Sequence, residues 1–134
     1  MSSVREFYDA HDWYDDPDRG WIGDGVAFVA REGLIVGCVR VVEVSPQMLV
    51  VEDVLVAPER RGSGIGTQLM QALMNSRGGA LHLCCHEDRI AFYERLGFSE
   101  VIFDDLPEPV QERMRLVGDY PTPPGHVHHF LRAR

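Results

Sequence analysis

The sequence predicts a mixed α/β fold, in which one sheet carries helices packed on its faces. Two apolar runs, residues 48–57 and 80–85, are nearly continuous, which is typical of strands that are buried on both faces. Between them, residues 67–76 place Leu69 and Leu73 on one stripe of a helix. The alternation of strands and helices after an initial hairpin therefore indicates one mixed sheet rather than a bundle or a sandwich.

Each element is bounded by glycine, proline or a cluster of polar residues. We expect a weak helix over residues 4–13, an acidic turn at 15–20, a hairpin of strands over 26–30 and 34–44, a strand over 48–57, a helix over 67–76, a strand over 80–85, a helix over 88–96, a strand over 98–103 and a last strand over 126–131. Asp88 is the expected N-cap of the short helix over residues 88–96, and Gly97 is the residue that ends it. Five prolines between residues 107 and 124 predict a tail that is mostly loop, with Met114 and Leu116 in the core.

Length, composition and charge fit one cytoplasmic domain. The 134 residues, of which 45% are hydrophobic and 25% charged, are ordinary for a single globular domain, which we expect over residues 1–134. The net charge of −8 repels phosphate backbones and anionic lipid, so it disfavours nucleic acid and membranes as partners and favours a cationic substrate. The odd number of cysteines, with Cys84 and Cys85 adjacent, argues against a disulfide framework, and no signal-peptide pattern is present.

The most informative segment is the glycine-rich turn Arg61-Gly62-Ser63-Gly64-Ile65-Gly66, between a buried strand and a helix. A helix start offers unpaired backbone N–H groups, and glycines let a ligand approach the backbone, so the turn predicts a phosphate or pyrophosphate site. Thr67 and Gln68 follow the turn, which excludes the P-loop and the dinucleotide-binding glycine pattern. An ordinary glycine-rich turn is the alternative.

This turn resembles the R/Q-x-x-G-x-G/A signature of the GNAT acetyltransferase superfamily. Residues 90–98, which read Ile-Ala-Phe-Tyr-Glu-Arg-Leu-Gly-Phe, are similar to the second signature of the same superfamily. The two motifs stand in the expected order and spacing, and the resemblance extends over residues 26–98. It implies a GNAT-like acyl-CoA N-acyltransferase fold with a shortened N-terminal region, and acetyl-CoA as cosubstrate.

The resemblance also implies roles for individual residues. The pyrophosphate of CoA would bind backbone N–H groups of the turn, and the pantetheine arm would lie along the preceding strand; the residues concerned are Val54, Val56, Arg61, Gly62, Ser63, Gly64, Ile65, Gly66 and Thr67. Tyr93 matches the tyrosine that protonates the leaving thiolate.

An amine acceptor must lose a proton before it attacks, and two carboxylates precede the CoA strand contacts. Glu52 and Asp53 interrupt an apolar strand, where a carboxylate is costly to bury without a purpose or a partner. Strand alternation places Glu52 on the face of Val54 and Val56, which makes Glu52 the first candidate base and Asp53 the second. A bulge would reverse that choice, and an ion pair with Arg40 is the structural alternative.

His86 stands where the second signature often has asparagine. It is a candidate for a CoA contact, for a substrate contact, for the base or for a simple cap of the strand end. The tail contains His126, His128 and His129, but no further ligand stands out beside them in the sequence, so we expect no metal site.

The leading hypothesis is an N-acetyltransferase that acts on a primary amine of a small molecule or peptide. An alternative is an enzyme like the glucosamine-6-phosphate acetyltransferases, which residues 51–54 and Cys85 resemble, with Arg40 and Arg89 to bind the sugar phosphate. A further alternative is a non-catalytic acyl-CoA-binding regulatory module. The resemblance also implies that the final strands can form a homodimer.

Overall fold

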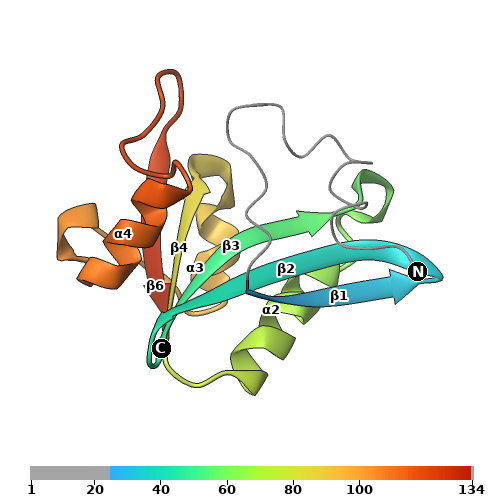
Figure 1. Ribbon diagram of the computed structural model, residues 1–134. Helices are drawn as coiled ribbons and strands as arrows, with labels where there is room; N and C mark the ends of the chain where they lie inside the picture. Colours follow the sequence, from blue (N-terminus) through green and yellow to red (C-terminus); the bar gives the residue numbers. More distant parts are fainter. Residues whose placement is uncertain (1–24, 134) are drawn as a thin grey trace.

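The computed structural model describes residues 25–133, which form one mixed sheet with helices on both of its faces (Figure 1). The strands are β1 Val26–Glu32, β2 Leu34–Ser45, β3 Met48–Val56, β4 Ala80–His86, β5 Ser99–Val101 and β6 His128–Ala133. The helices are α2 Ile65–Ser76, α3 Ile90–Arg95 and α4 Glu108–Leu116, with short 3₁₀ turns η1 Pro58–Arg60, η2 Glu87–Arg89 and η3 Phe103–Asp105. The helix expected over residues 4–13 and the acidic turn at 15–20 lie outside the described residues.

The sheet has the strand order β1-β2-β3-β4-β6-β5. Only β3 and β4 run parallel among these neighbours, while the other pairs are antiparallel. A parallel pair needs a crossover, and α2 supplies it. The mixed sheet with helices that the sequence predicts is therefore confirmed.

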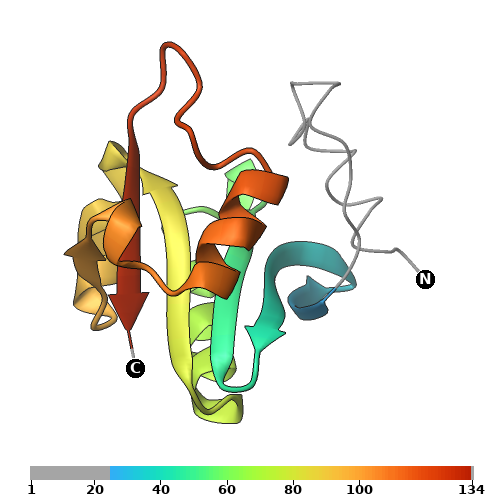
Figure 2. The same ribbon diagram turned by 60° about the vertical axis from the view of Figure 1, so that its left-hand side comes forward.

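Two apolar layers cover the two faces of the sheet, and Figure 2 shows α2 and α4 on opposite sides of it. One layer packs α2 and α3 against the sheet and includes Met70 and Leu73, both fully buried. The other packs α4 against the sheet and includes Val110 and Met114, again fully buried. Successive side chains along a strand point alternately into the two layers, which explains why β3 is apolar on both faces.

Helix α4 is the main departure from the sequence-based expectation, which made this part of the tail a loop. Pro107 and Pro109 stand at the start of the helix, where a proline costs no hydrogen bond because the first N–H groups have no helical partner. Met114 is buried in the core as expected. Leu116, which we also expected in the core, is 65% exposed, so that expectation was wrong.

Smaller differences occur at element ends. Asp88 is not an N-cap, because it lies inside η2 and α3 begins at Ile90 without a side-chain cap. Gly97 does end α3, at φ +99°, with its own N–H donating to Glu94 O and the next N–H, of Phe98, donating to Tyr93 O. None of the helices among residues 25–133 is long and apolar enough to cross a membrane.

Candidate active site

The centre of the candidate site is an opening between the two parallel strands. β3 and β4 pair from Met48 with Ala80 to Val51 with Leu83. Beyond that point β3 continues to Val56 beside β2, and β4 continues to His86 beside β6. The two strands therefore diverge at their carboxyl ends, as Figure 1 shows. In sheets of this kind ligands bind at the carboxyl ends of parallel strands, where the connections leave room for them.

The glycine-rich turn lies at this end of β3 and leads into α2. Gly62 and Gly64 both have φ above +80°, and Gly64 is the residue that precedes the helix. A side chain other than Asn or Asp is strained in that conformation, which accounts for the glycines. An added Cβ at either glycine would meet no atom within 4 Å, so both face open space. The first N–H groups of α2 follow directly, and a helix start of this kind binds anions.

The two motifs that the sequence singled out touch each other. A Cβ added at Gly66 would lie 3.5 Å from the Phe92 ring, an ordinary contact distance, so the start of α2 lies beside α3. At Gly37 on β2 an added Cβ would lie 2.8 Å from Ile65, so there the absence of a side chain lets α2 pack close to the sheet. The turn, the helix that follows it and α3 therefore form one packed unit beside the opening.

Tyr93 lies on α3 with its side chain in the layer beneath the opening. Its ring makes edge contacts with Phe92 and Phe98, at centroid distances of 5.0 and 5.7 Å. Burial raises the pKa of Tyr93 well above its ordinary value, the charges of Cys85 and Asp53 add to this, and Arg89 opposes it. Such a hydroxyl keeps its proton unless a strong base comes close.

A bulge in β3 decides where the two carboxylates point. Val41 pairs with Val51 but Arg40 pairs with Asp53, so Glu52 is the extra residue. Val54 and Val56 pack against the layer that contains α2. Glu52 instead reaches Arg113 of α4, on the opposite face. The expectation that Glu52 shares a face with Val54 and Val56 is thus wrong, and the bulge is the reason.

The carboxylates are held by two arginines. Arg113 donates to both oxygens of Glu52, from Nε at 2.8 Å and from Nη2 at 2.6 Å. Arg40 bridges the pair, from Nη2 to Glu52 at 3.1 Å and from Nε to Asp53 at 3.0 Å. The ion pair with Arg40, which the sequence left as the structural alternative, is present for both carboxylates. All four side chains are at least nine-tenths buried.

Cys85 is not a suitable nucleophile. Cys84 packs in the layer with α4 and Cys85 in the layer with α2 and α3, and no disulfide joins any of the cysteines within residues 25–133. Burial, together with the charges of Glu100 and Asp88, raises the pKa of Cys85 to about 11. The thiolate is therefore a minor species at neutral pH, and Cys85 is a core residue as the sequence indicates.

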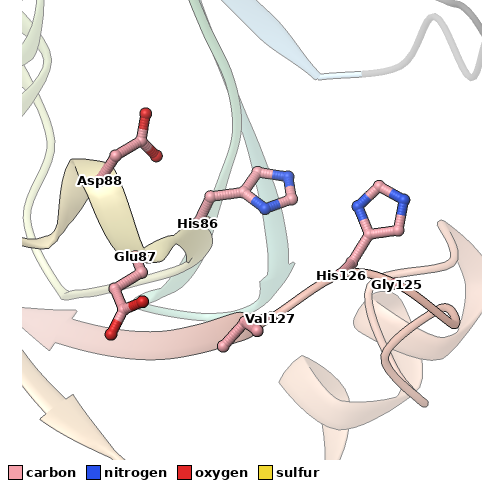
Figure 3. A pocket seen from close by; sticks show the side chains of 6 residues that line it. All are labelled: His86, Glu87, Asp88, Gly125, His126 and Val127. Atoms are coloured by element: carbon pink, nitrogen blue, oxygen red, sulfur yellow. The ribbon is translucent and has the colours of Figure 1, made fainter.

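His86 lies at the exposed end of β4, beside a hollow of about 490 Å³ that Glu87, Asp88, Gly125, His126 and Val127 also line (Figure 3). The structure brings His86 together with His126 and His128, and the ligand atoms of the three rings lie within 4.8 Å of one another. Sequence reasoning missed this group because His86 is 40 positions from His126 in the chain. His129, in contrast, pairs with Glu100.

Comparisons with known proteins agree with the architecture. A family model described as acetyltransferase (GNAT) domain matches residues 23–100. The N-acetylglutamate synthase of Neisseria gonorrhoeae, complexed with coenzyme A and N-acetyl-glutamate, has a TM-score of 0.64 at 18% identity over 100% of this chain and 28% of that one. An acetyltransferase from Bacillus cereus has a TM-score of 0.60 at 20% identity over 100% of this chain and 94% of that one.

A third solved structure is a Mycobacterium tuberculosis protein in complex with CoA and NLQ. Its TM-score is 0.62 at 20% identity, over 81% of this chain and 76% of that one. This chain thus spans 28% of the Neisseria synthase but most of the other two proteins. At these identities the structures establish a shared fold.

Proposed function

This chain belongs to the GNAT acetyltransferase family, and we propose that it transfers an acetyl group from acetyl-CoA to a primary amine of a small molecule or peptide. The observation that carries the proposal is the opening between β3 and β4, which has the glycine turn at one side and the Tyr93 helix at the other. An anion site and a proton donor at one opening are what an acyl-CoA reaction requires.

The cosubstrate is proposed to bind along β3 and the turn. The backbone N–H groups from Arg61 to Thr67 would hold the pyrophosphate, since α2 begins there. The stretch of β3 beyond Val51 has left its pairing with β4, so its backbone at Val54 and Val56 would take the pantetheine arm in the manner of an added strand. The same stretch would polarise the thioester carbonyl through a backbone N–H.

Tyr93 is proposed as the general acid. The amine nitrogen attacks the thioester carbon, the C–S bond breaks, and the leaving thiolate takes the phenolic proton. Because burial raises the pKa of Tyr93, the hydroxyl carries at neutral pH the proton that a general acid must have, while the same shift makes it a weaker acid.

The carboxylate pair on β3 is proposed to supply the base that removes a proton from the amine. Glu52 is held at both oxygens by Arg113 and lies toward α4, which favours a structural role for it. The charge of Asp53 is one of the causes that raise the pKa of Tyr93, so Asp53 acts electrostatically on the proposed acid. We therefore propose Asp53 before Glu52, the reverse of the order that strand alternation gave.

A sugar-phosphate acceptor is less well supported. Arg40, one of the two arginines that would bind its phosphate, is buried and bonded to Glu52 and Asp53. The net charge of −8 also favours a cationic or neutral amine over an anionic one. A non-catalytic CoA-binding module would not need the hydroxyl of Tyr93, whereas the ring and the paired carboxylates also serve the fold.

The experiment is a screen for CoA release from acetyl-CoA with a panel of acceptors: polyamines, arylalkylamines, peptides, glucosamine-6-phosphate and α-amino acids. The amino acids are included because the Neisseria synthase was crystallised with N-acetyl-glutamate. Turnover with a cationic or neutral amine is expected. Better turnover on glucosamine-6-phosphate would reject the proposed acceptor class, and acetyl-CoA binding without turnover on any amine would reject the enzyme.

A further inference from the structure

We propose that His86, His126 and His128 form a binding site for a divalent transition-metal ion of the zinc type. The proposal concerns the end of β4 and the segment that enters β6, and it does not depend on acetyl transfer. It goes beyond the family assignment, which needs no metal.

The three imidazoles come from two distant parts of the chain. His86 and His128 are paired across β4 and β6, and His126 lies two residues before His128 in the loop that enters β6. The ring centroids are 5.1 to 6.0 Å apart in all three pairs. Figure 3 shows the rings of His86 and His126 turned toward one another, while the carboxylates of Glu87 and Asp88 point away from both.

The spacing is close to that of a metal site. Metal–nitrogen bonds of about 2.0–2.1 Å in a tetrahedral arrangement place two ligand nitrogens about 3.4 Å apart. The ligand atoms here lie within 4.8 Å of one another. His86 and His126 are exposed, so the surface leaves their side chains room for the change of rotamer that the shorter spacing requires.

A second observation concerns the orientation of His128. Its Nδ1 lies 2.9 Å from the backbone oxygen of Asp119, which fits an Nδ1–H that donates to that carbonyl. In this tautomer the lone pair is on Nε2. A ligand histidine commonly has its other nitrogen bonded to a carbonyl or carboxylate, which fixes both the tautomer and the ring orientation. His128 already has that arrangement.

The chemistry of the donors defines the class of ion. Three neutral imidazoles suit Zn²⁺, Co²⁺, Ni²⁺ or Cu²⁺ and are poor ligands for Mg²⁺ or Ca²⁺, which prefer oxygen. Three protein ligands leave a fourth position for water or another small ligand, as in an open zinc site. The nearby carboxylates of Glu87 and Asp88 and the net negative charge of the chain attract a cation to the hollow.

The test uses the full chain without a histidine tag. Zn²⁺ binding is measured by calorimetry, and Co²⁺ binding by its visible absorption, whose intensity reports a four-coordinate site. We expect one ion per chain. His126→Ala and His86→Ala should each weaken Zn²⁺ binding by at least the roughly 10–100-fold that loss of a hydrogen-bond partner of a ligand costs.

The matched control is His129→Gln, which removes a histidine of the same strand that pairs with Glu100 and lies outside the group. It should leave Zn²⁺ affinity unchanged. Absence of Zn²⁺ binding in the folded protein would overturn the proposal. So would affinity that survives both alanine variants, or affinity that falls only in His129→Gln. Because no step measures CoA release, failure here leaves the proposed acetyltransferase untouched.

Discussion

The carboxylate of Glu52 on β3 and the guanidinium of Arg113 on α4 form a buried two-bond ion pair, with 4% and 8% of the side chains exposed. The pair joins the bulge in the sheet to the helix that covers this face. Arg40 on β2 donates a further hydrogen bond to the same carboxylate. The segment of β3 that borders the proposed thioester site is thereby fixed from two sides.

Breaking this pair should destabilise the fold. Arg113→Gln leaves a buried carboxylate without its main partner, and loss of one member of a buried pair typically costs about 3–5 kcal/mol. Urea unfolding measures the change. Arg115→Gln is the control on the same helix, because Arg115 lies over the Phe103 and Tyr120 rings at 5.1 and 5.8 Å and its loss should cost about 1 kcal/mol or less. Equal losses in both variants would contradict a dominant role for the pair.

Tyr93→Phe should lower kcat by about 10²–10⁴-fold, the usual contribution of a positioned acid. Only the hydroxyl is removed, so the ring packing against Phe92 and Phe98 is kept and KM for acetyl-CoA should change little. Steady-state kinetics with the best acceptor of the screen measures both constants. Tyr120→Phe, in the layer with α4, is the control. A native kcat in Tyr93→Phe would remove the acid assignment.

The two carboxylates should differ in their pH–rate profiles. If Asp53 removes the amine proton, Asp53→Asn should lose rate chiefly at low pH, where the amine is most protonated, and should recover partly as the pH rises. Glu52→Gln should mainly lose stability, because its partners are the two arginines. Rate is measured from pH 6 to 9 on variants shown to be folded. The opposite pattern would return the base role to Glu52, and unchanged profiles in both would leave it to another group such as water.

Gly64→Asp should weaken CoA binding. The residue precedes α2 in a left-handed conformation that Asn and Asp tolerate best after glycine. Asp adds a negative charge where the pyrophosphate is proposed to lie, whereas Gly64→Asn adds a side chain of the same shape without the charge. Calorimetry with CoA compares the two folded variants. Equal affinity in both would place the pyrophosphate elsewhere.

His82 should make the protein less stable in mild acid. The side chain is buried in β4 with Nδ1 bonded to Leu49 O at 3.1 Å, and burial lowers the pKa of His82 from its ordinary value of 6.5. Below that value the unfolded chain binds a proton that the folded chain refuses, so the free energy of unfolding falls as the pH falls, by at most about 1.4 kcal/mol per pH unit.

His82→Asn removes the titration and keeps a donor near Leu49. The free energy of unfolding is measured for both proteins at pH 7.5 and pH 5. The decrease between the two values should be smaller in the variant, since every other titrating group is shared. An equal decrease would show that His82 does not contribute.

The sequence by itself determined the architecture and the position of the glycine turn before α2. Periodicity and glycine placement are local properties of the sequence. They therefore predict β3, α2 and α3 to within a few residues, and they predict the turn from Arg61 to Gly66. Gly97 was identified as the end of α3 for the same reason, because only its own backbone conformation is involved.

Tertiary structure decided which side chains meet. One extra residue in β3 turned Glu52 toward Arg113. The bulge depends on how β3 pairs with β2, and the sequence of β3 alone does not reveal it. The prolines at the start of α4 made the sequence look like a loop, whereas burial of Val110 and Met114 stabilises the helix. His86 met His126 and His128 only because β4 and β6 pair in the sheet, and long-range pairing of this kind is not written in any local pattern.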